Sequence, residues 1–125
     1  MKKFSNTWKS SKKQRKQRKY RFKSPLHVKQ KLMHAHLSRE LKKKYGKRSV
    51  GLRKGDKVRI MRGQYRKHEN KIERIDLKKT GVFVSGIEIT KKDGSKNMIM
   101  LDPSNIMIIE LNLDDKLRQK SIERK

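Results

Sequence analysis

The chain contains no cysteine, so neither a disulfide framework nor thiolate chemistry is available to its 125 residues, and a reducing compartment is compatible with it. Apolar residues are also scarce, at 31% against the roughly 45–50% of typical globular chains, a figure that also counts glycine. No run approaches the ~18 apolar residues of a membrane span, and the basic N-terminus lacks the apolar segment of a secretory signal. We therefore expect no membrane segment, a small core, and regions whose order depends on a partner.

Acidic residues are the second shortage, because 12 Asp and Glu stand against 38 Lys and Arg, which gives a net charge of +26. The imbalance is concentrated in residues 1–54, which hold 21 basic residues and a single acid, Glu40. Such self-repulsion within one short arm is tolerated when a polyanion neutralises it. Nucleic acid is the favoured partner. An anionic membrane is disfavoured, since the arm has no continuous Leu/Phe face.

No constellation of catalytic or metal-binding residues stands out. His68 and Glu69 are adjacent on an expected loop, but nothing marks a nucleophile beside them. The other histidines are His27, His34 and His36, with no cysteine to complete a zinc site of a common type. We expect no enzymatic activity, no cofactor, no metal and no small-molecule substrate.

Residues 1–23 form a basic arm in which four of the seven aromatics alternate with charges, among them Trp8 and Tyr20. Flat rings beside guanidinium groups suit stacking on bases with cation contacts to phosphate. A solvated disordered tail is the alternative, but such tails are poor in aromatics. We predict an arm that is disordered alone and ordered on RNA. Its predicted RNA contacts are Trp8, Lys12, Lys13, Arg15, Lys16, Arg18, Lys19, Tyr20, Arg21 and Lys23.

Residues 24–49 are predicted to be an extension with two short helices. Ser24 followed by proline is typical of a helix N-cap with proline at the first helical position. Ser38 is expected to cap a second helix over residues 39–45, which Gly46 ends. Neither helix is long enough to be stable alone, so both should pack on the remaining chain, on RNA, or on both. The predicted RNA contacts here are His34, His36, Lys47 and Arg48.

Residues 50–111 carry the alternating apolar pattern of short strands and are the predicted folded core. The parity of that pattern flips at Gly86, which indicates a bulge or sharp bend of the kind that turns a barrel corner. Asp-Gly at 93–94 is typical of a hairpin turn. The Met-rich run 97–100 is expected to fill the core. Residues 112–125 are expected to be a polar C-terminal tail with helical potential.

The stretch 54–76 combines a turn, a strand, a cationic loop and a returning strand. Alternation over 57–62 sends Val58 and Ile60 to one side of a strand and basic groups to the other. The polar loop that follows surrounds Tyr65, which either stacks on a base or packs beneath the loop. This arrangement suits a small barrel that offers one loop to a polyanion, although a solvated turn is the plainer alternative. The predicted RNA contacts are Arg59, Arg62, Gly63, Tyr65, Arg66, Lys67, His68 and Lys71.

This stretch resembles a KOW motif, the strand–loop–strand unit of SH3-like barrels in ribosomal proteins and transcription elongation factors. The residues that carry the resemblance are Gly55, Asp56, Val58, Arg62, Gly63, Glu69, Lys71 and Ile72. Lys67 and Asn70 stand where the family usually has loop glycines. Asparagine is the commonest non-glycine residue in left-handed backbone, so Asn70 is expected to hold the turn.

The likeness extends over roughly residues 20–125, including 24–33, 37–41 and 102–105. Over this span the chain resembles the archaeal and eukaryotic form of the universal KOW protein of the large ribosomal subunit. The resemblance implies a mainly β fold, a small SH3-like (KOW) barrel with a long basic N-terminal extension carrying short helices and a short C-terminal tail. It also implies a cytoplasmic protein that binds the 5′ region of the large rRNA, joins early in subunit assembly, and sits among neighbouring ribosomal proteins near the nascent-chain tunnel exit.

Without the resemblance, the charge and the residue pattern support only a small β-barrel with a basic arm that binds structured RNA. One alternative is a KOW module of a transcription elongation factor, although such a factor usually needs a polymerase-binding domain for which 125 residues leave no room. The other is a generic basic protein that condenses nucleic acid. Co-fractionation with ribosomal subunits, with polymerase, or with mixed nucleic acid separates the three.

Overall fold

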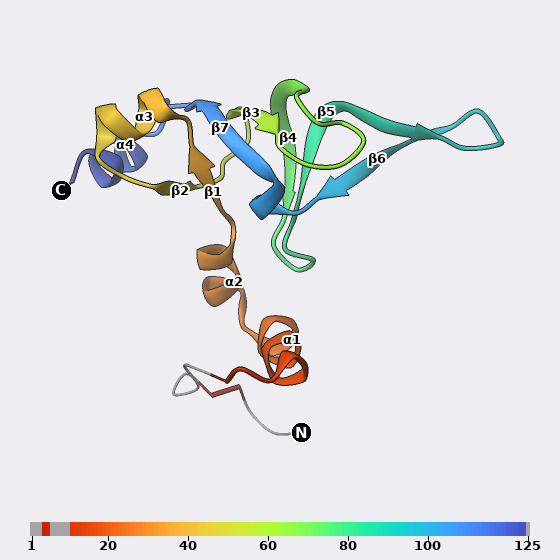
Figure 1. The fold of residues 1–125 in the computed structure, drawn as a ribbon, viewed down its shortest axis with the longest axis horizontal. Helices are drawn as coiled ribbons and strands as arrows, with labels where there is room; N and C mark the ends of the chain where they lie inside the picture. Colours follow the sequence, from red (N-terminus) through yellow and green to blue (C-terminus); the bar gives the residue numbers. More distant parts are fainter. Residues whose placement is uncertain (1–3, 6–10, 125) are drawn as a thin grey trace.

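A computed structural model describes residues 4–5 and 11–124, and these residues form seven strands, four α-helices and one 3₁₀ turn (Figure 1). The strands are β1 (His34–Leu37), β2 (Ser49–Gly51), β3 (Lys57–Ile60), β4 (Glu69–Asp76), β5 (Gly81–Thr90), β6 (Lys96–Leu101) and β7 (Ile106–Glu110). The helices are α1 (Gln14–Lys23), α2 (Leu26–Leu32), α3 (Arg39–Tyr45) and α4 (Lys116–Glu123), and the 3₁₀ turn is η1 (Pro103–Asn105).

The strands make one mixed sheet in the order β2-β1-β7-β3-β4-β5-β6. All neighbouring pairs are antiparallel except β1 and β7, which run parallel. The KOW-like stretch supplies β3 and β4 at the centre of this order. Helices α1 and α2 descend from one side of the sheet, whereas α3 and α4 lie together at one end (Figure 1). The prediction of a mainly β, SH3-like barrel fold with short helices is confirmed.

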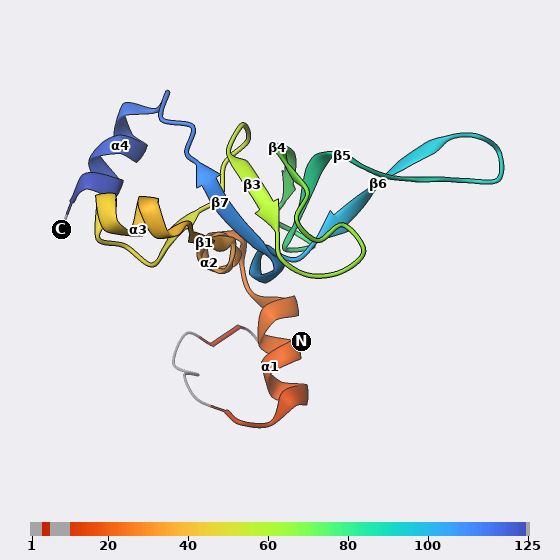
Figure 2. The same cartoon turned by 45° about the horizontal axis from the view of Figure 1, so that its top comes forward.

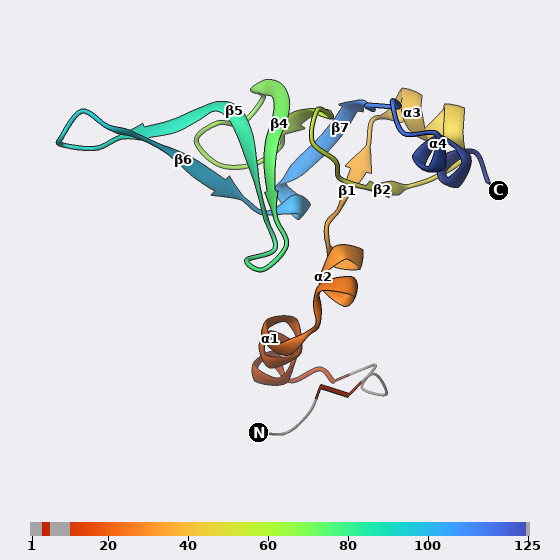
Figure 3. The ribbon, with the colours of Figure 1, turned by 180° about the vertical axis from the view of Figure 1, so that it is seen from behind.

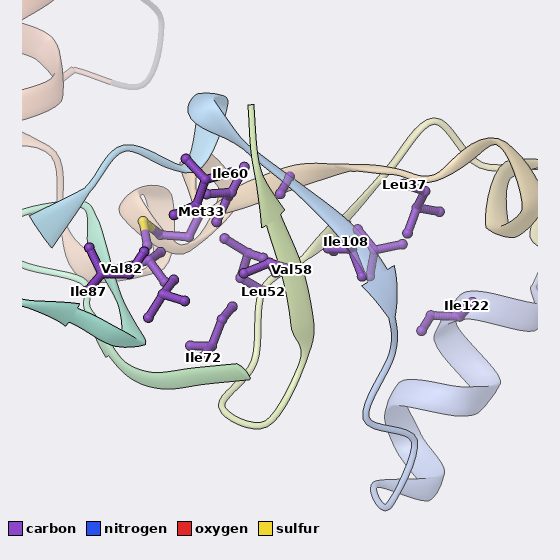
Figure 4. Close-up of a cluster of buried hydrophobic side chains, with 14 residues drawn as sticks. Met33, Leu37, Leu52, Val58, Ile60, Ile72, Val82, Ile87, Ile108 and Ile122 are labelled. Carbon is purple, nitrogen blue, oxygen red and sulfur yellow. The ribbon is translucent and has the colours of Figure 1, made fainter. Parts of the chain in front are cut away.

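The hydrophobic core extends beyond the predicted segment 50–111. Val58, with no exposed surface, packs in one cluster with side chains of β4, β5 and β7, as Figure 4 shows. Met33 and Leu37 join this cluster from before residue 50, and Ile122 joins it from α4. Fully burying such a side chain stabilises the fold by about 1.5–3 kcal/mol. The extension and the C-terminal segment are therefore parts of the packed body.

Local capping chemistry explains α3. The Oγ of Ser38 accepts a hydrogen bond from the Leu41 amide at 3.3 Å, and Gly46 ends the helix with a left-handed φ of 63°. Both predicted ends are confirmed. The prediction for Ser24 is wrong, because Pro25 is the N-cap residue of α2. Ser24 instead follows α1, where its hydroxyl donates to a carbonyl oxygen at 2.7 Å.

Helix α1 occupies most of the segment that we predicted to be disordered without RNA. Its Lys, Arg and Gln residues are good helix formers, yet it has no buried residue. A ten-residue helix without packing is marginal in water. The behaviour of residues 1–23 in the absence of RNA therefore stays a prediction.

The expected corner in β5 is confirmed. Gly86 has φ +75°, and the register between β5 and β6 shifts between Phe83 and Glu88. Beyond this point the two strands continue as a long hairpin that projects past the core (Figure 3). Gly94, with φ +81°, sits in the predicted hairpin turn. The expectation that the Met-rich run fills the core is wrong for Met100, which is 45% exposed because it lies on the outer face of β6.

A buried ion pair attaches the C-terminal segment to the sheet. The two terminal nitrogens of the Arg118 guanidinium donate to the two carboxylate oxygens of Asp56 at 2.6 and 2.7 Å. Asp56 has no exposed surface, and it also accepts hydrogen bonds from the Arg53 and Asn112 amides at 2.8 and 2.9 Å. The turn before β3 is thus fixed by α4, and residues 112–124 are more than a polar tail.

Candidate nucleic-acid interface

Backbone hydrogen bonds define the shape of the KOW loop, the segment 61–68 between β3 and β4. The Lys67 amide donates to the Ile60 carbonyl at 2.8 Å, and the His68 amide donates to the Tyr65 carbonyl at 3.1 Å. Gly63, the third residue of the loop, has φ +90°. These bonds hold the loop side chains on a fixed backbone.

Lys67 is the non-glycine residue of the loop with a left-handed φ, which is 73°. The expectation that Asn70 holds this turn is wrong, because Asn70 lies in β4 opposite Val58. The chain has to reverse at Lys67 so that its amide reaches the carbonyl at the end of β3. A left-handed conformation costs a lysine about 1–2 kcal/mol.

Tyr65 packs beneath the KOW loop. Its ring contacts the hydrophobic core, and its hydroxyl donates to the Glu88 carbonyl of β5 at 3.2 Å. The ring of His68 stands edge-on to it, with centres 6.0 Å apart. Of the two roles considered for Tyr65, the structure shows packing, which supports the loop from below.

The loop cations differ from Arg59 in their partners. Arg62, Arg66 and Lys67 are exposed and form no ion pair with any described residue. The same holds for His68 in the loop and for Lys71 just after it. Arg59 is paired with Glu69, whose Oε1 accepts from Nε at 2.6 Å. The loop charges are therefore available to an anion, whereas the charge of Arg59 is already compensated.

The predicted contacts of the extension lie apart from the KOW loop. His34 and Arg48 are exposed and His36 is half-buried, on β1 and beside β2. Strands β7 and β3 separate them from β4 in the sheet. Lys47 donates from Nζ to the Ser121 carbonyl of α4 at 2.5 Å, so it connects two parts of the protein.

The predicted arm contacts from Lys12 to Lys23 form a second cationic surface, which we call the arm surface. Every lysine and arginine from 12 to 23 is exposed, and Tyr20 is half-buried, with its ring centre 4.9 Å from that of Phe4. Figure 2 shows α1 well separated from the KOW loop. Trp8 lies outside the described residues.

The arm surface also approaches an acid of the barrel. Partial burial acts to raise the pKa of Asp102, yet hydrogen bonds from Ser104 and the charge of Arg21 lower it below its ordinary value.

Among residues 4–5 and 11–124, no group of His, Asp and Glu gathers as metal ligands would. Over the same residues, no helix has the length and apolar character to cross a membrane.

Comparison with known proteins decides which kind of protein presents these surfaces. The family described as ribosomal proteins L26 of eukaryotes, together with their archaeal counterparts, matches residues 11–125. The chain belongs to this family. It is similar to large ribosomal subunit protein uL24 of Methanothrix thermoacetophila, at 46% identity over 114 residues that cover 91% of this chain and 98% of the relative. The uL24 protein of Methanosphaera stadtmanae is 44% identical over 115 residues, which cover 92% of this chain and 98% of that protein.

The resemblance to the archaeal and eukaryotic KOW protein of the large subunit is thereby confirmed. As a member of this ribosomal family, the chain is a structural ribosomal protein, and the expectation that it is not an enzyme is confirmed. This membership selects the ribosomal interpretation over a transcription factor module and over a generic condensing protein.

Sequence reasoning missed two basic residues of this ribosomal protein. Lys29 is buried and donates from Nζ to the Lys78 carbonyl at 2.7 Å, which joins α2 to the β4–β5 turn. The guanidinium of Arg74 lies over the ring of Phe83, 4.3 Å from its centre. The alternation of β4 places Arg74 on the outer face, but its aromatic partner depends on the strand register. No local signal could have identified either contact.

Proposed function

We propose that this protein binds large-subunit rRNA through two separate surfaces, the KOW loop and the arm surface. The observation that carries the proposal is the state of the loop cations: Arg62, Arg66 and Lys67 are exposed, with no ion pair to any described residue, on a backbone fixed by hydrogen bonds. Cations at fixed positions match the phosphates of a folded RNA, which proteins recognise mainly by shape.

The arm surface contributes affinity by a different route. Six of the ten residues of α1 are Lys or Arg, and all six are exposed. Each phosphate that they neutralise releases counterions, which makes binding strong at low salt and independent of base sequence. The arm therefore supplies affinity, whereas the loop supplies orientation.

The finer parts of the proposal rest on the family resemblance. The target is the 5′ region of the large rRNA, and the protein joins the subunit early in its assembly in the cytoplasm. Its place is near the exit of the nascent-chain tunnel, among neighbouring ribosomal proteins. The names of the two relatives, both large-subunit proteins, support a place in that subunit.

Substitutions in the loop test the proposal. Arg66→Ala should weaken binding to a 5′ rRNA fragment and reduce the magnitude of the slope of log K against log salt by about 0.7–0.9. Arg66→Lys keeps the charge but loses the planar fork, so it separates a bidentate contact from a point charge. Lys120→Ala, an exposed lysine of α4, is the matched control.

Two outcomes would contradict different parts of the proposal. If the Ala variants of Arg62, Arg66, Lys67 and Lys71 all bind like the wild type, the loop is a solvated turn and the arm alone binds. If a 3′ fragment of the large rRNA binds as tightly as the 5′ fragment, the 5′ target is wrong while RNA binding stands.

A further inference from the structure

Three side chains outside both cationic surfaces form a row across β4, β5 and β6. The sheet register pairs Arg74 with Phe83, and Phe83 with Met100. Residues paired across neighbouring strands project from the same face of a sheet. Val82 and Val84, on either side of Phe83, are buried in the core. The row therefore lies on the outer face, away from the core.

Arg74 is held by an aromatic ring, and its charge is near enough to Asp76 of the same strand to help lower the pKa of that acid. Its guanidinium carbon is 4.3 Å from the centre of the Phe83 ring, which is only 8% exposed beneath it. Arg74 itself is exposed, and no described carboxylate forms an ion pair with it. A guanidinium supported by a ring on one side keeps its other face and its N–H edges open.

Met100 extends the row and lies close to the strand. A Cβ at position 81 would clash with its Cγ and Sδ, so Gly81 is what allows the side chain to lie over β5. Met100 is still 45% exposed. The thioether thus forms an accessible apolar border to the cationic plane of Arg74.

We propose that Arg74, Phe83 and Met100 form a stacking platform for an unpaired base of the rRNA, a step that rests on the proposed function. The base would stack on the open face of the Arg74 guanidinium, which the Phe83 ring supports from below. Met100 would contact the edge of the base with its polarizable sulfur.

The neighbouring β4–β5 turn favours RNA over a protein as the occupant. It carries Lys78 and Lys79, both exposed and beyond the end of the row. The turn is fixed, because Lys29 donates to the Lys78 carbonyl at 2.7 Å and the Lys79 amide donates to Asp76 at 3.0 Å. Two lysines beside a stacked guanidinium match the phosphates that flank a base, whereas an apolar protein surface would desolvate three cations.

Single-stranded octamers of adenosine and of uridine are the probes, used with the full chain. Purines stack better than pyrimidines, so the wild type should prefer the adenosine octamer, and saturation should shift the NMR signal of the Met100 methyl group. Arg74→Lys keeps the charge but removes the plane. It should weaken binding of the adenosine octamer by about tenfold, and that of the uridine octamer by less. Arg39→Lys, at an exposed position of α3, is the matched control and should change neither.

Three results would overturn the platform. In the first, the Met100 methyl signal does not move at saturation. In the second, Arg74→Lys weakens the binding of both octamers equally, which would mean that Arg74 does not stack on a base. In the third, crosslinks from the row in the assembled subunit reach a protein instead of RNA. Met100→Ala provides a second variant in case Arg74→Lys alters the fold, which its melting temperature would reveal. If Arg66→Ala weakens rRNA binding while these tests fail, only the platform is wrong.

Discussion

The two terminal helices are both short and polar, yet only one of them belongs to the packed fold. α4 has eight residues and α1 has ten. In α4, Arg118 and Ile122 are buried and Asp115 caps the first turn by accepting from the Leu117 amide at 2.9 Å. In α1 no residue is buried, and Lys13 stands at the N-cap without a side-chain cap bond.

Charge pairing explains the difference. Among the described residues, the barrel contains one fully buried carboxylate, that of Asp56, and Arg118 of α4 forms an ion pair with it. The cations of α1 find no such partner among the described residues, and two of them, Arg15 and Lys16, lie at the positive end of its helix dipole. A cationic helix is therefore part of this fold when the fold contains an acid for it, and otherwise depends on an external polyanion. The predictions that follow test this comparison by its effect on folding free energy, from the largest effect to the smallest.

Removal of the buried cation should have the largest effect. Arg118→Ala leaves the Asp56 carboxylate buried without its partner, which should lower the free energy of unfolding by about 3–5 kcal/mol. Urea denaturation measures this, with Lys120→Ala, an exposed lysine of the same helix, as the control. A loss below about 1 kcal/mol would mean that α4 is as loosely attached as α1.

The corner of β5 should give the next largest effect. Gly86→Val forces a β-branched residue to φ +75°, and its Cβ would come within 3.1 Å of the Asn70 amide nitrogen. We expect a loss of at least about 1 kcal/mol in a thermal or urea melt. Ser85→Val, at the exposed neighbouring position, should change stability little. An unchanged melting temperature for Gly86→Val would show that the bulge does not need a glycine at this position.

Lys67 should give a smaller effect of opposite sign. Lys67→Gly relieves the left-handed strain of about 1–2 kcal/mol, and the extra freedom of glycine in the unfolded chain offsets about 0.5–1 kcal/mol of this gain. The variant should therefore be slightly more stable and bind RNA more weakly, since it loses a charge. Asn70→Gly, in paired β4, should destabilise instead. If Asn70→Gly stabilised the protein, Asn70 rather than Lys67 would be the residue in the strained, left-handed position.

Features set by neighbours along the chain were predictable from the sequence. The cap at Ser38, the stop at Gly46 and the bulge at Gly86 depend on a few adjacent residues, and all three predictions are confirmed. The partnership of Arg118 with Asp56 was not predictable, because 62 positions separate them and the register of the whole fold brings them together. The loop cations were predicted as a group, but which of them are already paired depends on the cross-strand neighbours of β3.

Deletion of the arm should have the smallest effect on stability. No residue from 14 to 23 is fully buried, so a chain beginning at residue 24 should keep its free energy of unfolding within about 0.5 kcal/mol. In the full-length protein without RNA, hydrogen exchange should find no protected amides in residues 1–23, because a helix of this length without packing opens readily. Added rRNA fragment should slow exchange in α1, while α4 should be protected in both states. Slow exchange in α1 without RNA would show that the two helices are alike, and that the arm is ordered by the protein itself.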